Sequence, residues 1–300
     1  MQASLSSKLS SDRVLRLVPW IFVVLWSTGF IGAKYGLPYS EPFTFLSWRM
    51  AGNLAVFLLL MRLFKVSFPK EPKLWLQQGI AGSLIHGAYL GGVFSAIETG
   101  ASAGLTALLV SLQPILVAIL MAFLYQNTPS MKQWTGLALG ISGVCLVLVG
   151  GQADLLGGDL LSLSEFGWIL LALFGITLGT LYQKKYCEPQ SLLSASFIQY
   201  LATLAITLIC VALWEEGTVE WHPEFIGAMA WSVLVLSVGA IMLLMLMIQA
   251  GEATKTASYF YLVPPFTAIE AWILFDEQFT SVALVGMAIT VWGVYWVNKK

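Results

Sequence analysis

The chain has 300 residues, of which 58% are hydrophobic and only 10% are charged, and its mean hydropathy is +0.81. Soluble domains carry roughly a quarter charged residues, so this composition excludes a soluble globular protein. The net charge of −1 does not favour a nucleic-acid partner. We therefore predict an all-α polytopic membrane protein whose surroundings are the lipid bilayer.

A helix that crosses a bilayer needs about 20 predominantly apolar residues. Division of the sequence at its polar and turn-rich clusters predicts ten such segments in chain order, at residues 17–37, 42–63, 74–97, 101–124, 132–150, 165–183, 191–213, 225–248, 255–275 and 280–297. The first apolar run follows basic residues, as in a signal peptide, but it extends to Leu37. We therefore interpret it as a retained first helix.

Basic residues predict the orientation of the ten segments, because cytoplasmic loops carry an excess of Lys and Arg. With the N-terminus in the cytoplasm, thirteen of the 15 basic residues fall on the inner side, namely Lys8, Arg13, Arg16, Arg62, Lys65, Lys70, Lys73, Lys132, Lys184, Lys185, Lys255, Lys299 and Lys300. The outer loops are acidic instead. Both termini are thus predicted to be cytoplasmic.

The second half of the sequence repeats the first at a shift of 150 residues. Residues 103–147 align with 253–297 without a gap, and thirteen of the 45 positions are identical, including Pro114/Pro264 and Gly143/Gly293. Five segments per half is an odd number, so the second half must enter the membrane from the opposite side. We predict two inverted five-helix repeats, the architecture of many secondary transporters. The expected division is a cytoplasmic tail at 1–16, repeats at 17–150 and 165–300, and a periplasmic linker at 151–164.

Inverted repeats place a substrate site near the midplane between the halves. An ionisable residue within a span costs free energy in the bilayer, so such residues are candidates for this site. Arg49 lies seven residues past Pro42, and Glu270 lies six residues before Asp276, so both are roughly 10 Å below the outer boundary. One interpretation is a buried Arg49–Glu270 ion pair that only fixes helix packing. The other is contact with substrate, in which Arg49 binds a carboxylate and Glu270 binds an ammonium group or titrates as a proton-coupling site.

Two further ionisable residues lie within spans. His86 is flanked by glycines that permit close helix approach, and it is either a proton acceptor in the substrate site or a hydrogen-bonded packing residue. Lys34 lies near the outer end of the first helix, where its stem can reach the interface.

Polar and aromatic residues deep in the spans complete the candidate site. Most Trp, Tyr and Phe side chains fit interfacial belts, but four lie deeper beside small or polar neighbours such as Thr28, namely Trp26, Tyr89, Tyr259 and Tyr261. We include these five residues among the candidate substrate-binding residues. A pocket lined in this way would suit a mostly apolar or aromatic solute.

Gln113 and Pro114 interrupt one of the most apolar runs of the chain, "GLTALLVSLQPILVAILMAFLY". A proline inside a helix cannot donate its backbone hydrogen bond and clashes with the carbonyl four residues earlier, so the helix bends. Because Pro264 is the repeat partner of Pro114, we predict a kink or hinge at both. Gln113 has no polar counterpart at Val263, and it either hydrogen-bonds substrate or satisfies the freed backbone.

No sequence motif supports an enzyme. Gly100-Ala101-Ser102-Ala103-Gly104 matches G-x-S-x-G, but a nucleophile elbow requires a strand before the serine, and here the motif joins two membrane helices. The signatures HExxH and GxxxxGK[ST] do not occur. The three cysteines lack metal-ligand spacing. We expect no cofactor and no metal, and uphill transport would draw on an ion or solute gradient.

Two stretches carry a more specific resemblance, "WSTGFIGAKYGLPYSEPFTFLSWRM" and "AGLTALLVSLQPILVAILMAFLYQNTPSMKQWTGLALGISGV". They resemble the EamA-type repeat of the drug/metabolite transporter superfamily, and nearly the whole chain is similar to two tandem repeats. The resemblance implies ten helices, cytoplasmic termini and export of amino acids or related metabolites across the bacterial inner membrane. Where the family often ends the fourth helix with an acidic residue, this chain has Gln126-Asn127, whereas Asp276-Glu277 fits the pattern.

We therefore predict a secondary transporter that exports small metabolites by alternating access. The first alternative is a proton-coupled efflux carrier for drugs or cationic compounds, with Glu270 as the proton site. A polytopic membrane enzyme and a non-transporting scaffold are further alternatives.

Overall fold

The computed structural model describes residues 12–113, 115–117, 119–120, 130–150, 161–187, 190–240, 243 and 262–298. In these residues the secondary structure is helical apart from one isolated bridge between Ser40 and Val219. The helices form ten segments in the order of the predicted spans: α2 (Asp12–Gly36) with η1 (Leu37–Tyr39), α3 (Pro42–Leu63), α4 (Pro72–Gly82) with η2 (Ser83–Ala88) and α5 (Tyr89–Glu98), α6 (Ala103–Val110), α8 (Met131–Gly150), α9 (Leu163–Tyr186), α10 (Leu192–Trp214), α11 (Pro223–Ala230) with η3 (Trp231–Ala240), α14 (Val263–Phe275), and α15 (Ser281–Asn298). The predicted all-helical fold with ten helices is confirmed.

Six of these segments are long and apolar enough to cross a membrane, namely those at Leu17–Tyr39, Pro42–Leu63, Pro72–Glu98, Leu163–Tyr186, Leu192–Trp214 and Pro223–Ala240. The other four are apolar helices of 10–17 residues within the described part of the chain. Many of their large apolar side chains are exposed, including Trp272 and Trp292. Such a surface requires lipid around it, so the protein is a multi-pass membrane protein.

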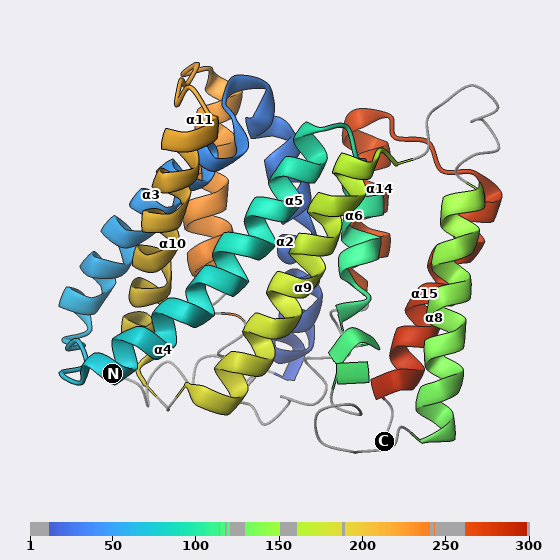
Figure 1. Cartoon of the computed structure of the whole chain (residues 1–300), viewed down its shortest axis with the longest axis horizontal. Coiled ribbons are helices and arrows are strands. Elements are labelled where there is room, and N and C mark those ends of the chain that lie inside the picture. The colour runs from blue at the N-terminus through green and yellow to red at the C-terminus, as the bar shows by residue number, and fades with distance from the viewer. Residues whose placement is uncertain are drawn as a thin grey trace.

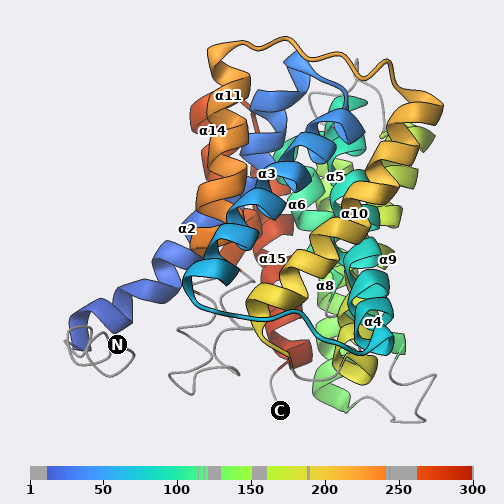
Figure 2. The same cartoon turned by 90° about the vertical axis from the view of Figure 1, so that its left-hand side faces the viewer.

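Consecutive helices run in alternating directions along one common axis (Figures 1 and 2). The start of α2 and the end of α15 lie at the same end of the molecule, which we call the terminal end. The α2–α3, α5–α6 and α14–α15 connections lie at the opposite end, which we call the distal end.

Two of the long segments are not α-helical throughout. The segment from Pro72 to Glu98 contains the π-helical stretch η2, and α11 continues into the π-helical stretch η3. A π-helical turn changes the backbone hydrogen-bond register, and such turns are frequent at functional sites. The Thr203 hydroxyl donates to the Gly82 carbonyl at 3.0 Å and the Ser237 hydroxyl donates to the Ser232 carbonyl at 3.0 Å, so side chains satisfy backbone acceptors there.

The described part of the fourth span is interrupted where the proline motif predicts a bend. The regular helix α6 ends at Val110, and Ser111 and Leu112 form a turn. Pro114 itself lies outside the described residues, so its role as a hinge stays a prediction. Pro264 lies in the first turn of α14, where a missing backbone N–H leaves no helical hydrogen bond unmade. What precedes Leu262 is outside the described residues, so the hinge at Pro264 also stays a prediction.

Helices α8 and α15 pack against each other at one edge of the molecule (Figure 1). Their contact depends on glycines. A Cβ atom at Gly143 would lie 2.5 Å from the backbone nitrogen of Thr290, and one at Gly293 would lie 2.4 Å from the backbone nitrogen of Gly140. Gly143 and Gly293 are repeat partners in the sequence, so the same close approach is made from both sides.

Candidate functional site

A cavity of about 130 Å³ lies between helices of both halves of the chain. Its described lining comes from α2, α3, η2, α5, α9, α10 and η3, which belong to the first three and the sixth to eighth spans. Most of the lining is apolar. The polar or amphipathic members are Trp26, Arg49, His86, Tyr89, Tyr200 and Ser237. The structure thus brings together four of the residues that the sequence singles out: Trp26, Arg49, His86 and Tyr89.

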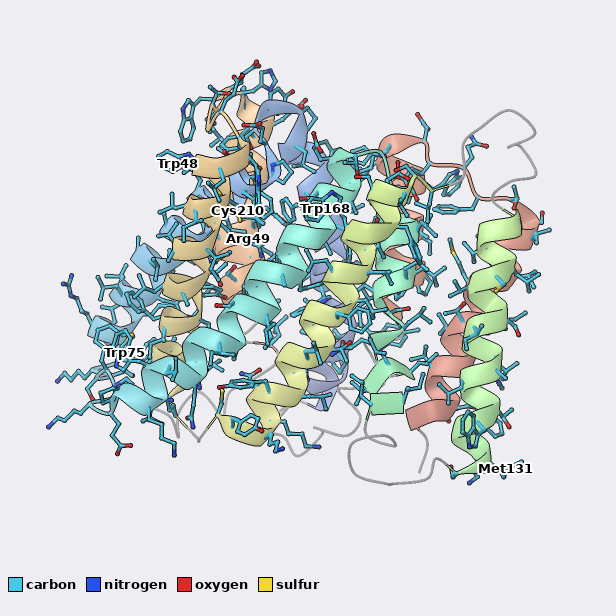
Figure 3. The ribbon with its side chains drawn as sticks, viewed as in Figure 1. Trp48, Arg49, Trp75, Met131, Trp168 and Cys210 are labelled. Carbon is cyan, nitrogen blue, oxygen red and sulfur yellow. The ribbon has the colours of Figure 1, made fainter. Side chains whose placement is uncertain are left out.

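Arg49 is a buried, charged residue in the described lining of this cavity. It is only 8% exposed, although its neighbour on α3, Trp48, is 48% exposed on the outer face of the helix. Figure 3 shows both residues in the half of the molecule toward the distal end, whereas Trp75 and Met131 lie at the terminal end. The Arg49 Nε is buried without a hydrogen-bond partner, and no described carboxylate pairs with the guanidinium.

His86 is held by a chain of buried amides. Its Nε2 lies 3.2 Å from Gln199 Oε1, and Gln199 Nε2 donates to Gln78 Oε1 at 2.7 Å. The amide oxygen of Gln199 is an acceptor, so His86 donates from Nε2 in this arrangement. The ring of His86 also contacts that of Tyr200, with centroids 4.9 Å apart. This chain fixes the imidazole at the cavity wall.

Glu270 does not pair with Arg49, so the ion pair considered from the sequence is not formed. Its Oε1 instead contacts the Ser27 hydroxyl on α2 at 2.7 Å, and its Oε2 is buried without a partner. Sequence position gave similar depths for Arg49 and Glu270, but depth does not specify which face of a helix a residue occupies. Glu270 does not line the described cavity.

Thr28 and Gln113 also lie off the described cavity lining. The Thr28 hydroxyl donates to the Leu25 carbonyl at 2.6 Å and accepts from Trp231 Nε1 at 2.8 Å. Gln113 Nε2 donates to Thr180 Oγ1 of α9 at 3.1 Å, a contact between spans that the sequence did not suggest. Tyr259 and Tyr261 lie outside the described residues. A role of these residues in substrate binding stays a prediction.

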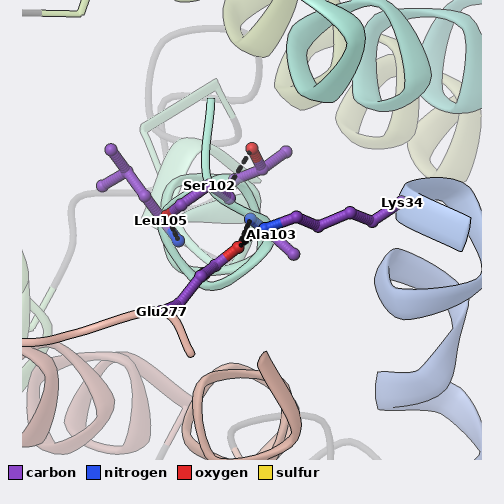
Figure 4. Close-up of polar contacts among 6 residues, drawn as sticks. Lys34, Ser102, Ala103, Leu105 and Glu277 are labelled. Atoms are coloured by element: carbon purple, nitrogen blue, oxygen red, sulfur yellow. Dashed lines mark hydrogen bonds and ion pairs between the residues drawn. The ribbon is translucent and has the colours of Figure 1, made fainter. Parts of the chain in front are cut away.

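A polar cluster joins three segments at the distal end (Figure 4). Lys34 Nζ forms an ion pair with Glu277 Oε1 at 2.5 Å, and the same oxygen accepts from the backbone N–H of Ala103 at 3.3 Å. The N-terminus of a helix favours negative charge, so Glu277 also complements the start of α6. Lys34 is therefore paired within the protein. Ser102 caps α6 by accepting from the backbone N–H of Leu105 at 3.2 Å. The serine of the G-x-S-x-G match therefore serves as a helix cap.

A second set of contacts connects the α2–α3 and α10–α11 loops at the same end. Glu215 accepts from the backbone N–H groups of Phe43 and Thr44, each at 2.7 Å, and so caps α3 from another helix. The hydroxyl of Tyr39 donates to Glu224 at 2.6 Å, and Glu41 accepts from the N–H of Glu216 at 2.9 Å. Together with the Lys34–Glu277 cluster, these contacts join the two halves of the chain at the distal end.

A larger apolar groove of about 920 Å³ runs along α14 and α15. Its lining includes Ile269, Trp272, Trp292 and Tyr295, all exposed on the outer surface of the molecule. The described lining of this groove carries no charged side chain. In a membrane protein such a surface faces lipid, so the smaller cavity at Arg49 is the better candidate site.

Tyr200 and Ser237 line the cavity and Gln199 hydrogen-bonds His86 at its wall, and the sequence interpretation missed all three. A usable signal existed, since Gln199 and Tyr200 form a polar pair in the middle of an apolar span. Ser237 was harder to find because single serines occur in several spans. In the described residues no group of three His, Cys, Asp or Glu side chains is arranged to hold a metal ion.

A ten-helix membrane bundle with a buried cavity between its halves is an architecture typical of polytopic membrane transporters. The profile of the EamA-like transporter family matches residues 18–149 and 163–299, which is nearly the whole chain as two units. The protein therefore belongs to the EamA-like transporter family. It is a transporter and not an enzyme, as the sequence predicted.

Curated proteins from several organisms are similar to the chain over almost its whole length. The uncharacterized transporter YvbV of Bacillus subtilis is 26% identical over 98% of this chain and 94% of its own length. A probable amino-acid metabolite efflux pump of Escherichia coli is 28% identical over 95% of this chain and 93% of its own length. The protein of the same description from Salmonella typhimurium is 27% identical over 92% and 91%.

A solved crystal structure has the same fold. It superposes with a TM-score of 0.61 and covers 95% of this chain and 96% of its own, at 20% sequence identity. At that identity the match supports the arrangement of the helices alone.

Proposed function

We propose that the protein exports small metabolites that carry a carboxylate, such as amino acids, across the bacterial inner membrane by alternating access. The observation that carries the proposal is Arg49, a buried guanidinium that faces a cavity whose described lining contains no carboxylate. A buried charge is costly unless it is paired, and a guanidinium presents donors that match a carboxylate in a bidentate geometry. A carboxylate substrate would supply the missing partner.

The two halves act as inverted repeats in this proposal. In support, α2 begins at the terminal end and α9, its counterpart in the second half, begins at the distal end (Figure 1). The distribution of Lys and Arg supports a cytoplasmic terminal end. The protein described here is then closed toward the periplasm by the Lys34–Glu277 and Glu215 contacts, and release of substrate requires these contacts to break.

The size and charge of the cavity favour a small metabolite over the alternative of a cationic drug. Pockets for drug-sized ligands have volumes of roughly 300–1,000 Å³, and this cavity has about 130 Å³. Of the described lining residues, Arg49 is the one with a permanent charge, and that charge is positive. A cation would be repelled there. The names of the Escherichia coli and Salmonella typhimurium relatives point to the same substrate class.

Purified protein in liposomes tests this function by counterflow, the uptake of labelled solute against an internal pool of the same solute. We expect exchange of at least one amino acid in a panel of acidic, basic, aliphatic and aromatic members. Arg49→Lys should lower exchange about tenfold or more, because a charged hydrogen bond contributes about 1.5–3 kcal/mol and 1.4 kcal/mol corresponds to a factor of ten.

Arg62→Ala is the matched control, since Arg62 is an exposed arginine at the other end of the same helix. It should retain wild-type exchange. Absence of exchange for every solute by folded wild-type protein would contradict the transport proposal. Equal exchange by wild-type and Arg49→Lys protein would contradict the role of Arg49.

A further inference from the structure

Three oxygen atoms meet at the contact between α2 and α14. The Ser27 hydroxyl oxygen lies 2.7 Å from Glu270 Oε1 and 2.8 Å from the carbonyl oxygen of Val24. Ser27 is completely buried, and the second carboxyl oxygen of Glu270 is buried without a partner. The Thr267 hydroxyl, one turn before Glu270, lies 3.4 Å from the Ser27 carbonyl oxygen, so α2 and α14 contact each other at two levels.

The number of available protons distinguishes two states of this contact. A serine hydroxyl has one proton to donate, and a backbone carbonyl can only accept. If Glu270 is ionised, the single proton of Ser27 is shared between Glu270 and Val24, as the proton of Thr203 is shared between the carbonyls of Gly82 and Gln199. If Glu270 is protonated, it donates to Ser27, Ser27 donates to Val24, and both contacts are hydrogen bonds. The buried Oε2 of Glu270, which has no partner, favours the protonated carboxyl, because a buried charge without a partner is costly.

The surroundings of Glu270 offer no positive charge to stabilise its ionised form among the described residues. On α2, the ammonium of Lys34 lies about two turns further along and is already paired with Glu277, and Tyr35 packs on the ring of Phe275. On α6, Ala103–Val110 contains no titratable residue. On α15, the titratable side chain is Tyr295.

We propose that Glu270 is a proton-binding site, separate from the Arg49 cavity, that is protonated in the closed arrangement of α2 and α14. Its link to the cavity is α2 itself, because Trp26 lines the cavity and the hydroxyl of the next residue, Ser27, lies 2.7 Å from Glu270 Oε1. When α2 moves away from α14, the carboxyl loses this acceptor and releases its proton to water as its O–H bond breaks. The coupling of this proton to solute transport rests on the function proposed above, whereas proton binding itself does not.

Infrared difference spectroscopy tests the proton site without any substrate. A protonated carboxyl has a C=O stretching band that an ionised carboxylate lacks. Wild-type protein in lipid nanodiscs should show such a band at neutral pH and lose it at alkaline pH, and Glu270→Gln should lack it. Glu277→Gln is the control, because Glu277 is ion-paired with Lys34, and it should retain the band.

Ser27→Ala provides a second arm that does not depend on the folding of Glu270→Gln. It removes the acceptor of the Glu270 proton, so the band should persist at a shifted frequency. No carboxyl band at any pH, or a band unchanged in both Glu270→Gln and Ser27→Ala, would overturn the proposal.

A transport arm then tests coupling separately. In liposomes filled with a pH-sensitive dye, a solute that the wild type exchanges should move protons, and a pH gradient should drive its net uptake. Glu270→Gln should retain counterflow and lose the response to the gradient. Absence of transport by the wild type would reject the proposed function but leave the infrared result intact. Gradient-driven uptake by Glu270→Gln equal to that of the wild type would reject coupling at Glu270.

Discussion

Gln199 shows how one buried side chain stabilises several others. Its amide joins His86 at the cavity wall to Gln78, which is 3% exposed, and the neighbouring Thr203 binds the carbonyl at the start of the π-helical stretch η2. Buried polar groups in an apolar environment must be satisfied within the protein. The contact between α10 and the segment from Pro72 to Glu98 therefore depends on the hydrogen bonds of Gln199 and Thr203.

We expect Gln199→Leu to destabilise the protein by about 1–3 kcal/mol, because it leaves the buried Gln78 oxygen without its donor. Thermal unfolding of purified protein in detergent measures the change. Leu208→Ala, on the lipid-facing side of the same helix where Leu208 is 52% exposed, should change stability by about 0.5 kcal/mol or less. Identical unfolding temperatures for wild type and Gln199→Leu would show that the amide chain contributes no stability.

At the scale of elements, α8 and α15 form the closest helix pair in the described chain and take no part in the described lining of the cavity. Small residues allow helix backbones to approach in a membrane, where association depends on packing and not on a hydrophobic driving force. The glycines of both helices face each other, as Gly143 and Gly286 show. We interpret this pair as a scaffold beside the moving helices.

Gly143→Ala should destabilise the protein by about 1–3 kcal/mol, because its Cβ would overlap the backbone of α15 and force the helices apart. Gly167→Ala is the matched control, since a Cβ there meets no atom within 4 Å. Thermal unfolding of both variants in one detergent makes the comparison. Equal destabilisation by the two substitutions would mean that loss of glycine, and not contact with α15, is the cause.

At the scale of the whole molecule, the described helices are arranged differently at the two ends. At the described distal end, the two halves are joined by the Lys34–Glu277 cluster, the Glu215 cap and the contacts of Tyr39. In Figure 2, by contrast, the start of α2 diverges from α10 and α4 toward the terminal end. Alternating access requires this asymmetry to reverse during the cycle.

The sidedness of this asymmetry is tested by reporter fusions. A fluorescent protein that folds only in the cytoplasm should be active after Lys300, and alkaline phosphatase, which needs the periplasm, should be active after Gly217 in the distal α10–α11 loop. The reciprocal fusions serve as controls and should be inactive. The opposite pattern would place the terminal end in the periplasm and make the closed end the cytoplasmic one.

Much of the fold was predictable from local composition. Ten apolar runs of adequate length specify ten helices, because a chain in lipid must satisfy its backbone within each segment. Four residues of the cavity lining were also identifiable, namely Trp26, Arg49, His86 and Tyr89. Polar and charged side chains are costly within such apolar runs, so they indicate functional or structural sites.

The partners of these residues were decided only by the tertiary structure. Ser27–Glu270 and Lys34–Glu277 each join residues 243 positions apart, and no local pattern specifies which faces of two distant helices meet. The π-helical stretches η2 and η3 likewise interrupt segments whose composition predicts continuous helices. The sequence by itself determined the spans, their order and the charged residues inside them, because these follow from transfer between water and lipid. Which of those residues share a cavity depended on helix packing, a property of the assembled bundle.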